Sequence, residues 1–456
     1  MVQVEPGSFR DPESRVFYAN GEVHRVLSQA GLDDFEALVA SGLLDDPRIV
    51  ATERVDDPPP DLLAHDAVAL LRHEPLPLVS YPYEWTFSML RDAALLQLDL
   101  LLSALEHDLM LKDASPYNVQ FRGARPVFID VGAFERLRPE ELWVGYRQFC
   151  MLYLYPLLLQ ALKGIDFRTW LRGSIDGISP VEMRGLMCFR ERFRRGLATS
   201  VFLHARLERG ARAGAARRAR ASVGKSVIHA NVRKMRKLVA RLDWRPPEGI
   251  WTRYGEENTY TETDARRKEE FVRQVAALRF ARLAWDLGAN NGRYSRVVAE
   301  HAEHVVALDA DPGPVELLYR DLRAAGDERI LPLATSVIDP SPGLGWRGRE
   351  RRPLLERGRP DLMLALALVH HVSIAGNVPL REFVDWLAEL GAPLVIEFPT
   401  RDDPMVQALL AAKREGLHPD YELDVFERDL GEYFDVRRRE QLGSGTRALF
   451  YATPKA

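Results

Sequence analysis

The strongest constraint on the fold is a change of pattern in the second half of the chain. Beyond "DWRPPEG" (243–249), short apolar runs alternate with amphipathic segments, beginning with "FARLAWDLG", "HVVALDAD" and "RILPLATSV". Further runs of the same kind are "PDLMLALALVHH" and "APLVIEF". Strands that alternate with helical segments of about 10 to 15 residues indicate βαβ units and a parallel sheet. The closing segments "YFDVRRREQL" and "TRALFYATP" predict a hairpin, whose last strand we expect to run antiparallel.

The first half of the chain carries separate signals of local structure. The segment "RVFYANGEVHRVL" (15–27) alternates around Asn20-Gly21, which predicts a β-hairpin. The segment "SMLRDAALLQLDLLLSALEHDL" (88–109) has apolar residues at helical spacing and predicts a long helix. Because 456 residues exceed one ordinary core, we predict several parts. These are a small β-containing lobe at residues 1–80, a helical module with a basic linker at residues 81–245, and an α/β domain at residues 246–456.

The net charge of −4 is unevenly distributed along the chain. Residues 190–241 hold sixteen Arg or Lys and only two Glu. A basic helix face can bind phosphate backbones or an acidic partner, and a solvated helical linker is the alternative. No aromatic residue interleaves with the basic ones in residues 206–241, which argues against nucleic acid as a partner.

Cysteine content and hydropathy bear on the compartment. Cys150 and Cys188 are too few for a disulfide framework, which favours a reducing environment. The N-terminal residues show no basic segment followed by an apolar run, so we expect no signal peptide. The most apolar stretch, at residues 149–162, is too short to span a bilayer. We therefore expect a cytoplasmic protein without a membrane partner.

The first strand-to-helix turn of the α/β half, "WDLGANNGRYS", has the features of a ligand site. Asp286 ends the predicted strand, and Gly288 and Gly292 bracket the turn, where glycine lets the backbone approach a ligand closely. Asp309 follows at the end of the next strand, where a carboxylate can accept hydrogen bonds from both ribose hydroxyls. An acid before the first glycine would repel a pyrophosphate but suits the cationic end of S-adenosylmethionine. The pattern therefore predicts an adenosine site at the carboxyl edge of the sheet.

This pattern, together with "ALDAD", resembles class I S-adenosylmethionine-dependent methyltransferases over roughly residues 250–456. The resemblance implies a Rossmann-like, seven-stranded domain with S-adenosylmethionine as cofactor. It implies that Asp309 binds the ribose, that Ala310 lies against the adenine, and that Ser336 holds the next contact. Tyr254 could cover the cofactor, with an ordinary core tyrosine as the alternative. The residues expected at the cofactor are Asp286, Gly288, Ala289, Asn290, Asn291, Gly292, Asp309, Ala310, Ser336, Val337 and Tyr254.

The predicted fourth and fifth strands supply candidates for the methyl-accepting side. The fourth strand ends "ALALVHH", and a histidine there can remove a proton from an acceptor. Neighbouring positions at a strand end point opposite ways, so we expect only one of His370 and His371 to face the pocket. A packed or positioning role is the alternative to a catalytic one for these residues. Glu397 in "VIEF" is a third candidate, and no suitably spaced metal ligands are evident.

A second candidate site lies in the first half of the chain, in "LKDASPYNVQFRGARPVFIDVG" (111–132). Asp-x4-Asn followed by Asp-x-Gly resembles the loops of the protein-kinase and aminoglycoside-phosphotransferase superfamily. The resemblance implies that Asp113 orients a hydroxyl nucleophile and that Asn118 and Asp130 hold the magnesium of Mg-ATP. The alternative is that Asp113 caps a turn and Asn118 fixes a loop.

The same region departs from the kinase pattern in informative ways. No glycine-rich loop is present, and no lysine precedes Lys112, so the lysine that clamps phosphates is absent. Arg25 or Arg54 could substitute, although an arginine is bulkier and its fork geometry differs. We therefore predict an α+β, mostly helical, kinase-like N-terminal module. Both phosphotransfer and a non-catalytic binding or scaffolding role remain open for it.

Segments along most of the chain, including "SFRDPESRVF", "LKDASPYNVQF", "ALALVHHVSIAGNVPL" and "EFPTRDDPMVQALL", resemble a bacterial family of large methyltransferases related to nodulation protein NoeA. The resemblance implies methyl transfer to oxygen, nitrogen or carbon of a small-molecule or carrier-bound acceptor. It does not supply that acceptor. The alternatives are a phosphotransferase that uses Asp113, Asn118 and Asp130, and a non-catalytic protein that binds nucleic acid or another partner through its basic helix.

Overall fold

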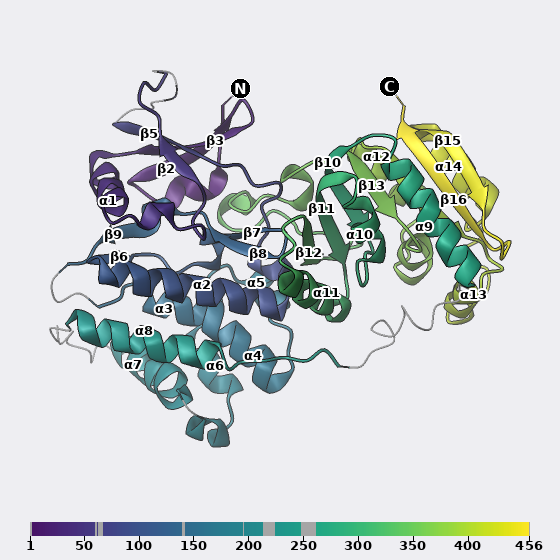
Figure 1. Ribbon diagram of the computed structural model, residues 1–456. Coiled ribbons are helices and arrows are strands. Elements are labelled where there is room, and N and C mark those ends of the chain that lie inside the picture. The colour runs from purple at the N-terminus through teal and green to yellow at the C-terminus, as the bar shows by residue number, and fades with distance from the viewer. Residues whose placement is uncertain are drawn as a thin grey trace. The chain divides into compact units, whose positions relative to one another are not determined.

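The computed structural model describes residues 2–59, 62, 67–138, 142–194, 196–212, 224–247 and 261–455. The chain forms two compact units, each coloured along the sequence in Figure 1. Unit 1 comprises Met1–Phe121, Pro126–Arg245 and Gly343–Arg352, and unit 2 comprises Arg122–Arg125, Pro246–Pro342 and Pro353–Ala456.

The predicted division at residue 80 is not a boundary between compact units, because residues 1–80 and 81–245 fall together in unit 1. Main-chain pairing joins them: Val50 N donates to Phe128 O at 2.8 Å. A sheet-type bridge at Ile49 and Phe128 extends this pairing.

Two short segments depart from the predicted domains, and each has a physical reason. The segment Gly343–Arg352 belongs to unit 1, where Arg10 donates to both carboxylate oxygens of Glu350, at 2.7 and 2.9 Å. The turn at residues 122–125 belongs to unit 2, where Ala124 N donates to Asp327 O at 3.0 Å.

Unit 1 contains a five-stranded antiparallel sheet in the order β1-β2-β3-β5-β4. The predicted hairpin around Asn20-Gly21 is confirmed: both residues have positive φ, at 54° and 82°, as a tight two-residue hairpin turn requires. The strands of this sheet are β1 Gln3–Val4, β2 Ser14–Ala19, β3 Glu22–Leu27, β4 Thr52–Arg54 and β5 Ala69–His73.

Among the described residues, the rest of unit 1 consists of helices and two sheets of two strands each. The predicted long helix is confirmed as α2, which ends at Glu106, three residues earlier than its apolar pattern. The sheets pair β6 with β9 and β7 with β8. The strands are β6 Leu109–Leu111, β7 Val119–Arg122, β8 Arg125–Phe128 and β9 Phe134–Arg136. The helices are α1 Gln29–Ala40, α2 Phe87–Glu106, α3 Tyr146–Phe149, α4 Tyr155–Lys163, α5 Arg168–Gly173, α6 Pro180–Leu186, α7 His204–Arg212 and α8 Lys225–Val239.

The basic stretch of residues 190–241 is not a solvated linker where the structure describes it. Helix α8 runs alongside α2 (Figure 1). It buries Ile228, Val232, Met235 and Val239. This spacing of three and four residues forms one apolar helix face. The lysines and arginines between these positions therefore lie on a helix that is packed into unit 1.

Unit 2 contains, among the described residues, a seven-stranded sheet in the order β12-β11-β10-β13-β14-β16-β15. The five strands β12, β11, β10, β13 and β14 are parallel, and β16 runs antiparallel to β14 and to β15, as the closing hairpin predicted. The order of the first five strands is that of a doubly wound Rossmann-type sheet. The strands are β10 Ala281–Leu287, β11 Ala302–Asp309, β12 Ile330–Ala334, β13 Leu362–Ala365, β14 Leu394–Pro399, β15 Phe434–Gln441 and β16 Arg447–Pro454.

Helices connect the strands of unit 2 in the way a doubly wound sheet requires. The strand order reverses direction at β10, so right-handed crossovers place the helices of the two halves on opposite faces. Helix α9 packs against α10, and α12 packs against α14. The helices are α9 Glu262–Ala276, α10 Arg293–Val298, α11 Pro312–Ala325, α12 Leu380–Glu389, α13 Pro404–Ala411 and α14 Leu423–Tyr433.

The predicted fourth strand is shorter than its apolar run suggested. Strand β13 ends at Ala365, and Ala367 has a φ of 51°, which no strand residue adopts. A helical turn at His371–Ala375 follows. In "LALVHH", Leu366 and Val369 are buried although they lie in an irregular segment and not in a strand. Hydrophobic pattern alone cannot distinguish such a segment from a continuing strand. Within the described residues, no helix is long and apolar enough to cross a membrane.

Candidate functional sites in the two units

The chain leaves β10 through a tight turn that brings its main chain close to the neighbouring strand. Gly288, Asn290 and Gly292 have left-handed backbone, with φ of 78°, 49° and 74°. Gly288 N donates to Leu308 O at 2.8 Å. Left-handed conformation is open to glycine and tolerated by asparagine, so this sequence can form a turn that most residues would strain.

Asp309, at the end of β11, is fixed by the same turn. Its Oδ2 accepts a hydrogen bond from Asn290 N at 2.8 Å, and its Oδ1 accepts one from Asp311 N at 2.9 Å. Burial raises the pKa of Asp309, and these main-chain donors oppose the increase. The carboxylate is therefore held in one orientation at the strand end.

Asp286, near the end of β10, is almost fully buried. Its Oδ2 accepts a hydrogen bond from Ser295 Oγ at 2.6 Å. Burial raises the pKa of Asp286 to about 6, against the opposing effects of Ser295 and of the positive charge of Lys268. A carboxyl group with this pKa carries a negative charge above pH 6 and can pair with a cation.

These residues border a cavity of about 400 Å³ at the carboxyl ends of β10, β11, β12 and β13. Parallel sheets of this kind bind ligands at that edge. Ten of the residues predicted for the site line the cavity, namely Asp286, Gly288, Ala289, Asn290, Asn291, Asp309, Ala310, Ser336, Val337 and His371. Gly292 shapes the turn without lining the cavity. Tyr254 lies outside the described residues.

The two predicted histidines differ in position. His371 lines the cavity, whereas His370 is fully buried beside it, with the ring centroids 4.1 Å apart. Burial lowers the pKa of His371 to about 4, with a further contribution from the charge of Arg447. Burial also lowers the pKa of His370, followed by the effect of His371. Both rings are therefore neutral near pH 7, and only His371 can contact a ligand in this cavity.

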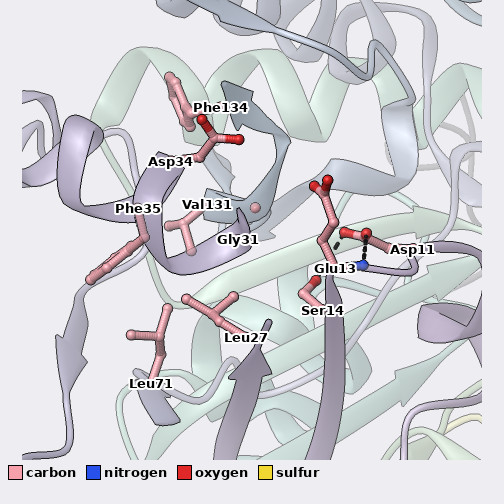
Figure 2. Close-up of a pocket in the computed structure, with 11 residues that line it drawn as sticks. Asp11, Glu13, Ser14, Leu27, Gly31, Asp34, Phe35, Leu71, Val131 and Phe134 are labelled. Carbon is pink, nitrogen blue, oxygen red and sulfur yellow. Dashed lines mark hydrogen bonds between the residues drawn. The ribbon is translucent and has the colours of Figure 1, made fainter. Parts of the chain in front are cut away.

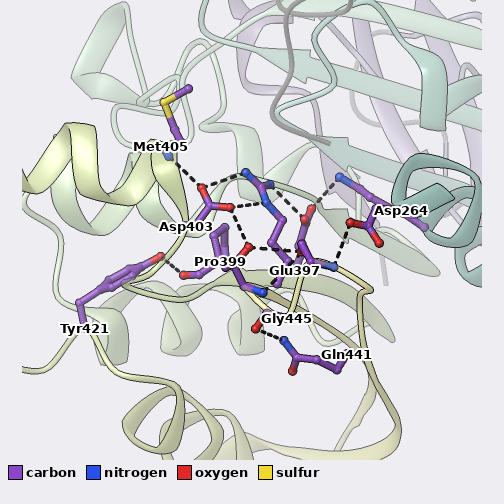
Figure 3. Close-up of polar contacts among 12 residues, drawn as sticks. Asp264, Glu397, Pro399, Asp403, Met405, Tyr421, Gln441 and Gly445 are labelled. Carbon is purple, nitrogen blue, oxygen red and sulfur yellow. Dashed lines mark hydrogen bonds and ion pairs between the residues drawn. The ribbon is translucent and has the colours of Figure 1, made fainter. Parts of the chain in front are cut away.

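Glu397 does not line the cavity, so its predicted place facing the acceptor needs correction. It is fully buried on β14, where Lys268 Nζ lies 2.6 Å from its Oε2 and Arg447 Nη1 lies 3.1 Å from its Oε1. Arg447 Nε in turn lies 2.6 Å from Asp403 Oδ2. Figure 3 shows Glu397 and Asp403 within this network of buried charges. The carboxylate of Glu397 therefore orients cations rather than a substrate.

Lys268 is one of several cavity residues that were not predicted from the sequence. It lies on α9, is 2% exposed and lines the cavity. A signal was present, because Lys268 stands at helical spacing with the buried Phe271, Val272 and Val275, in a position where an apolar residue is expected. A lysine on the buried face of an amphipathic helix indicates a partner or a ligand.

In unit 1, the structure brings together the three residues predicted for a second site. Asn118 Nδ2 donates to Asp113 Oδ2 at 3.2 Å. Arg25 Nη1 lies 2.7 Å from Asp130 Oδ1. Burial raises the pKa of Asp113, and the negative charge of Asp130 raises it further. Of the two arginines considered as substitutes for lysine, Arg25 is the one that reaches this cluster, since Arg54 pairs with Glu36.

The cluster borders a cavity of about 1120 Å³ in unit 1. One part of its wall is apolar, with Val16, Val23, Val50, Leu76 and Ile129, and another part carries the charged residues Arg25, Asp113 and Asp130. A second, much smaller hollow of about 10 Å³, lined in part by Asp11, Glu13 and Ser14, has room for one water molecule only (Figure 2). Within the described ranges, no group of three or more His, Cys, Asp or Glu side chains could hold a metal ion.

The fold and the site of unit 2 define a doubly wound α/β domain with a ligand cavity at the carboxyl edge of its parallel strands. The whole chain is 32% identical to nodulation protein NoeA of Rhizobium meliloti (strain 1021), over 97% of this chain and 94% of that protein. The chain therefore belongs to the NoeA family. No family model matches it.

Solved structures similar to this chain include methyltransferases. The N-methyltransferase NodS from Bradyrhizobium japonicum WM9 is 14% identical, with a TM-score of 0.31, and the match covers 42% of this chain and 98% of NodS. Magnesium protoporphyrin IX methyltransferase (ChlM) from Synechocystis PCC 6803, with bound SAH, is 15% identical, with a TM-score of 0.31. That match covers 45% of this chain and 92% of ChlM.

Proposed function

We propose that this protein is an S-adenosylmethionine-dependent methyltransferase whose donor site is the cavity of unit 2. The observation that supports it most is the convergence of Asp286, the glycine turn and Asp309 on one cavity of about 400 Å³. Small-molecule sites commonly measure about 300 to 1,000 Å³, so this volume suits one nucleoside-sized ligand. The buried acid at Asp286 favours a ligand with a cationic end over one with a pyrophosphate.

The residues of the cavity fit the parts of such a donor. Asp309 presents a fixed carboxylate, which can accept hydrogen bonds from the two hydroxyls of a ribose. Ala310 and Val337 offer apolar surface for an adenine, and Ser336 adds a hydroxyl to the cavity wall. Asp286 can pair with the ammonium group of the amino-acid end.

The chemistry then depends on how the chain holds an acceptor. When bound, the donor supplies a methyl group on a sulfonium centre. His371 is neutral at physiological pH, because its pKa is lowered to about 4, so its ring can accept a hydrogen bond from an acceptor hydroxyl or amine and orient that group. His370 packs against His371 and positions it. The acceptor is a small molecule or a carrier-bound group that is methylated on oxygen, nitrogen or carbon.

Isothermal titration calorimetry with S-adenosylmethionine and S-adenosylhomocysteine tests the donor site. Wild-type protein should bind both compounds, and Asp309→Ala should weaken binding by roughly 1 to 3 kcal/mol, because charge-assisted hydrogen bonds are lost. Asp321→Ala, an exposed acid on α11, is the matched control and should bind as the wild type does. Absence of binding by the wild type at high micromolar ligand would overturn the proposed function.

Phosphoryl transfer is a second candidate, favoured by one observation in unit 1. Asp113, Asn118 and Asp130 line the same cavity of about 1120 Å³. Asn118 and Asp130 carry oxygen atoms of the kind that Mg²⁺ prefers, and Asp113, whose pKa is raised by burial, could orient an acceptor hydroxyl. Arg25 provides a cation beside Asp130.

Hydrolysis of Mg-ATP by the purified protein tests this second candidate. Activity that disappears in Asp130→Asn but persists in Asp108→Asn would support it. Asp108 is a suitable control because it is an exposed acid next to β6. Its backbone is left-handed, which asparagine tolerates as well. Equal rates in the wild type and Asp130→Asn would exclude phosphoryl transfer at this cavity.

A further inference from the structure

The buried lysine of unit 2 requires an explanation, because an ammonium group loses its hydration when it is buried. Lys268 is 2% exposed, and its Nζ lies 2.6 Å from Glu397 Oε2 and 4.7 Å from the ring centroid of Tyr294. An unpaired buried charge costs several kcal/mol, and even a paired one is often no more stable than a well-packed apolar residue. Stability alone therefore gives little reason to keep a lysine at this position.

Glu397, the pairing partner of Lys268, has a second cation beside it. Glu397 is also approached by Arg447 Nη1, at 3.1 Å. The network continues through Arg447 to Asp403, and it brings two buried cations and two buried carboxylates together. The hydrogen bond to Glu397 fixes the position of the Lys268 ammonium. The cation–π contact with Tyr294 restricts the movement of this ammonium further.

Lys268 also lies close to the acid that the donor site would use. Lys268 and Asp286 line the same cavity, and the charge of each acts on the other. The cavity thus offers a cation and an anion next to the same glycine turn. An α-amino acid carries an ammonium and a carboxylate on one carbon atom, so a zwitterionic end is the ligand group that matches both charges at once.

We propose that Lys268 binds the α-carboxylate of the amino-acid end of the methyl donor, while Asp286 accepts a hydrogen bond from the α-ammonium of the same group. This role rests on the proposed function, since it assigns one more residue to the same donor. An ammonium has three N–H groups, so one lysine can serve both Glu397 and a ligand carboxylate. Lys268 thereby selects donors that keep their carboxylate over analogues that lack it.

Calorimetry with two classes of ligand tests the role of Lys268. S-adenosylmethionine and S-adenosylhomocysteine carry the carboxylate, whereas decarboxylated S-adenosylmethionine and 5′-methylthioadenosine lack it. Lys268→Met keeps an unbranched stem but removes the charge. We expect it to weaken binding of the first class about tenfold to a hundredfold, the range for losing a hydrogen bond to a charged group. Affinity for the second class should stay within about twofold of the wild type.

Two further variants keep the test decisive. Arg266→Met removes an exposed charge from the same helix and should change neither class of affinity. If Lys268→Met does not fold, the double variant Lys268→Met/Glu397→Gln lowers the buried charge imbalance, and it should show the same selective loss.

The outcomes separate this inference from the function beneath it. Equal loss for both classes of ligand, or no loss for either, would overturn the carboxylate-binding role of Lys268. Failure of the wild type to bind any of the four adenosyl compounds would instead overturn the methyl-donor site itself.

Discussion

The two candidate sites hold their carboxylates in different ways. In unit 2, Asp309 accepts hydrogen bonds from two main-chain N–H groups, and Asp286 from Ser295, so local structure fixes both acids. In unit 1, Asp130 pairs with Arg25, which comes from a distant strand of the sheet. The first arrangement leaves the acids to interact with a ligand, whereas the second neutralises one acid before any ligand arrives.

The difference teaches how each site can be recognised. Acids held by neighbouring main chain leave a short sequence signature, because the turn that supplies the N–H groups lies within a few residues of each strand end. An acid compensated by a side chain from another element leaves no local signature. The position of Asp309 at a strand end could therefore be predicted from spacing, while the pairing of Asp130 with Arg25 could not.

The largest expected effect comes from breaking the buried network beside the cavity of unit 2. Glu397→Ala leaves Lys268 and Arg447 buried next to each other with one carboxylate fewer, so we expect the free energy of unfolding to fall by about 3 to 5 kcal/mol. Urea denaturation measures it. Glu389→Ala, an exposed site at the end of α12, should change stability by less than about 0.5 kcal/mol. If both variants lose a similar amount of unfolding free energy, then breaking the buried network costs no more than changing an exposed residue, and the prediction is wrong.

Asp286, the buried acid in the cavity of unit 2, should give a smaller effect on stability, of opposite sign. Because the pKa of Asp286 is raised from 3.8 to about 6, the folded protein binds this proton more tightly than the unfolded chain does. Stability contributed by this group therefore falls as pH rises from about 4 to about 6 and stays low above that range. Asp286→Asn should remove this loss and stabilise the ligand-free protein by about 1 to 3 kcal/mol at pH 7.

Thermal unfolding across pH 4 to 8 measures this prediction, with the difference between Asp286→Asn and the wild type as the readout. The gain should be present at pH 7 and absent near pH 4, where the wild-type carboxyl is protonated. A constant difference over the whole range would contradict the assignment. The same variant should bind S-adenosylmethionine more weakly, so the acid would be kept for binding and not for stability.

The fold was largely predictable from sequence because its signals are local. The Asn20-Gly21 hairpin and the alternation of strands and helices after residue 250 each depend on neighbouring residues. The buried position of Lys268 was indicated by its helical spacing, but its partner Glu397 could not be identified, since it lies 129 positions away. The placement of Gly343–Arg352 in unit 1 was equally hidden, because the Arg10–Glu350 pair spans 340 positions.

The site of unit 2 was less predictable than the fold. The reason is that the backbone after β13 departs from a regular strand. The expectation that His370 and His371 point opposite ways assumed a strand that continues to its apolar end. Strand β13 instead ends at Ala365, and the two rings contact each other in a helical segment. The two side chains differ in their surroundings, since His370 is buried and His371 lines the cavity.

A smaller loss of stability is expected in the cavity of unit 1. Arg25→Met removes the cation that lies 2.7 Å from Asp130 and the hydrogen bond that Arg25 Nη1 donates to Ser14 Oγ. Since Asp130 remains partly exposed to water, we expect a loss of about 1 to 2 kcal/mol rather than the larger cost of a fully buried pair. Urea denaturation of Arg25→Met and of Arg25→Met/Asp130→Asn measures it. The double variant should recover part of the loss; no recovery would show that the charge of Asp130 is not the cause.

The smallest expected effect comes from an exposed ion pair in the same unit. Lys225 Nζ lies 2.6 Å from Asp108 Oδ1, as close as the buried pair of Lys268 and Glu397. Both partners on α8 and beside β6 are well exposed, so water and salt screen the attraction and side-chain ordering offsets much of it. Lys225→Gln should therefore change the free energy of unfolding by less than about 0.5 kcal/mol, and any change should vanish at 1 M salt. A loss as large as that of Arg25→Met would mean that distance between charges, and not their burial, decides what an ion pair contributes in this protein.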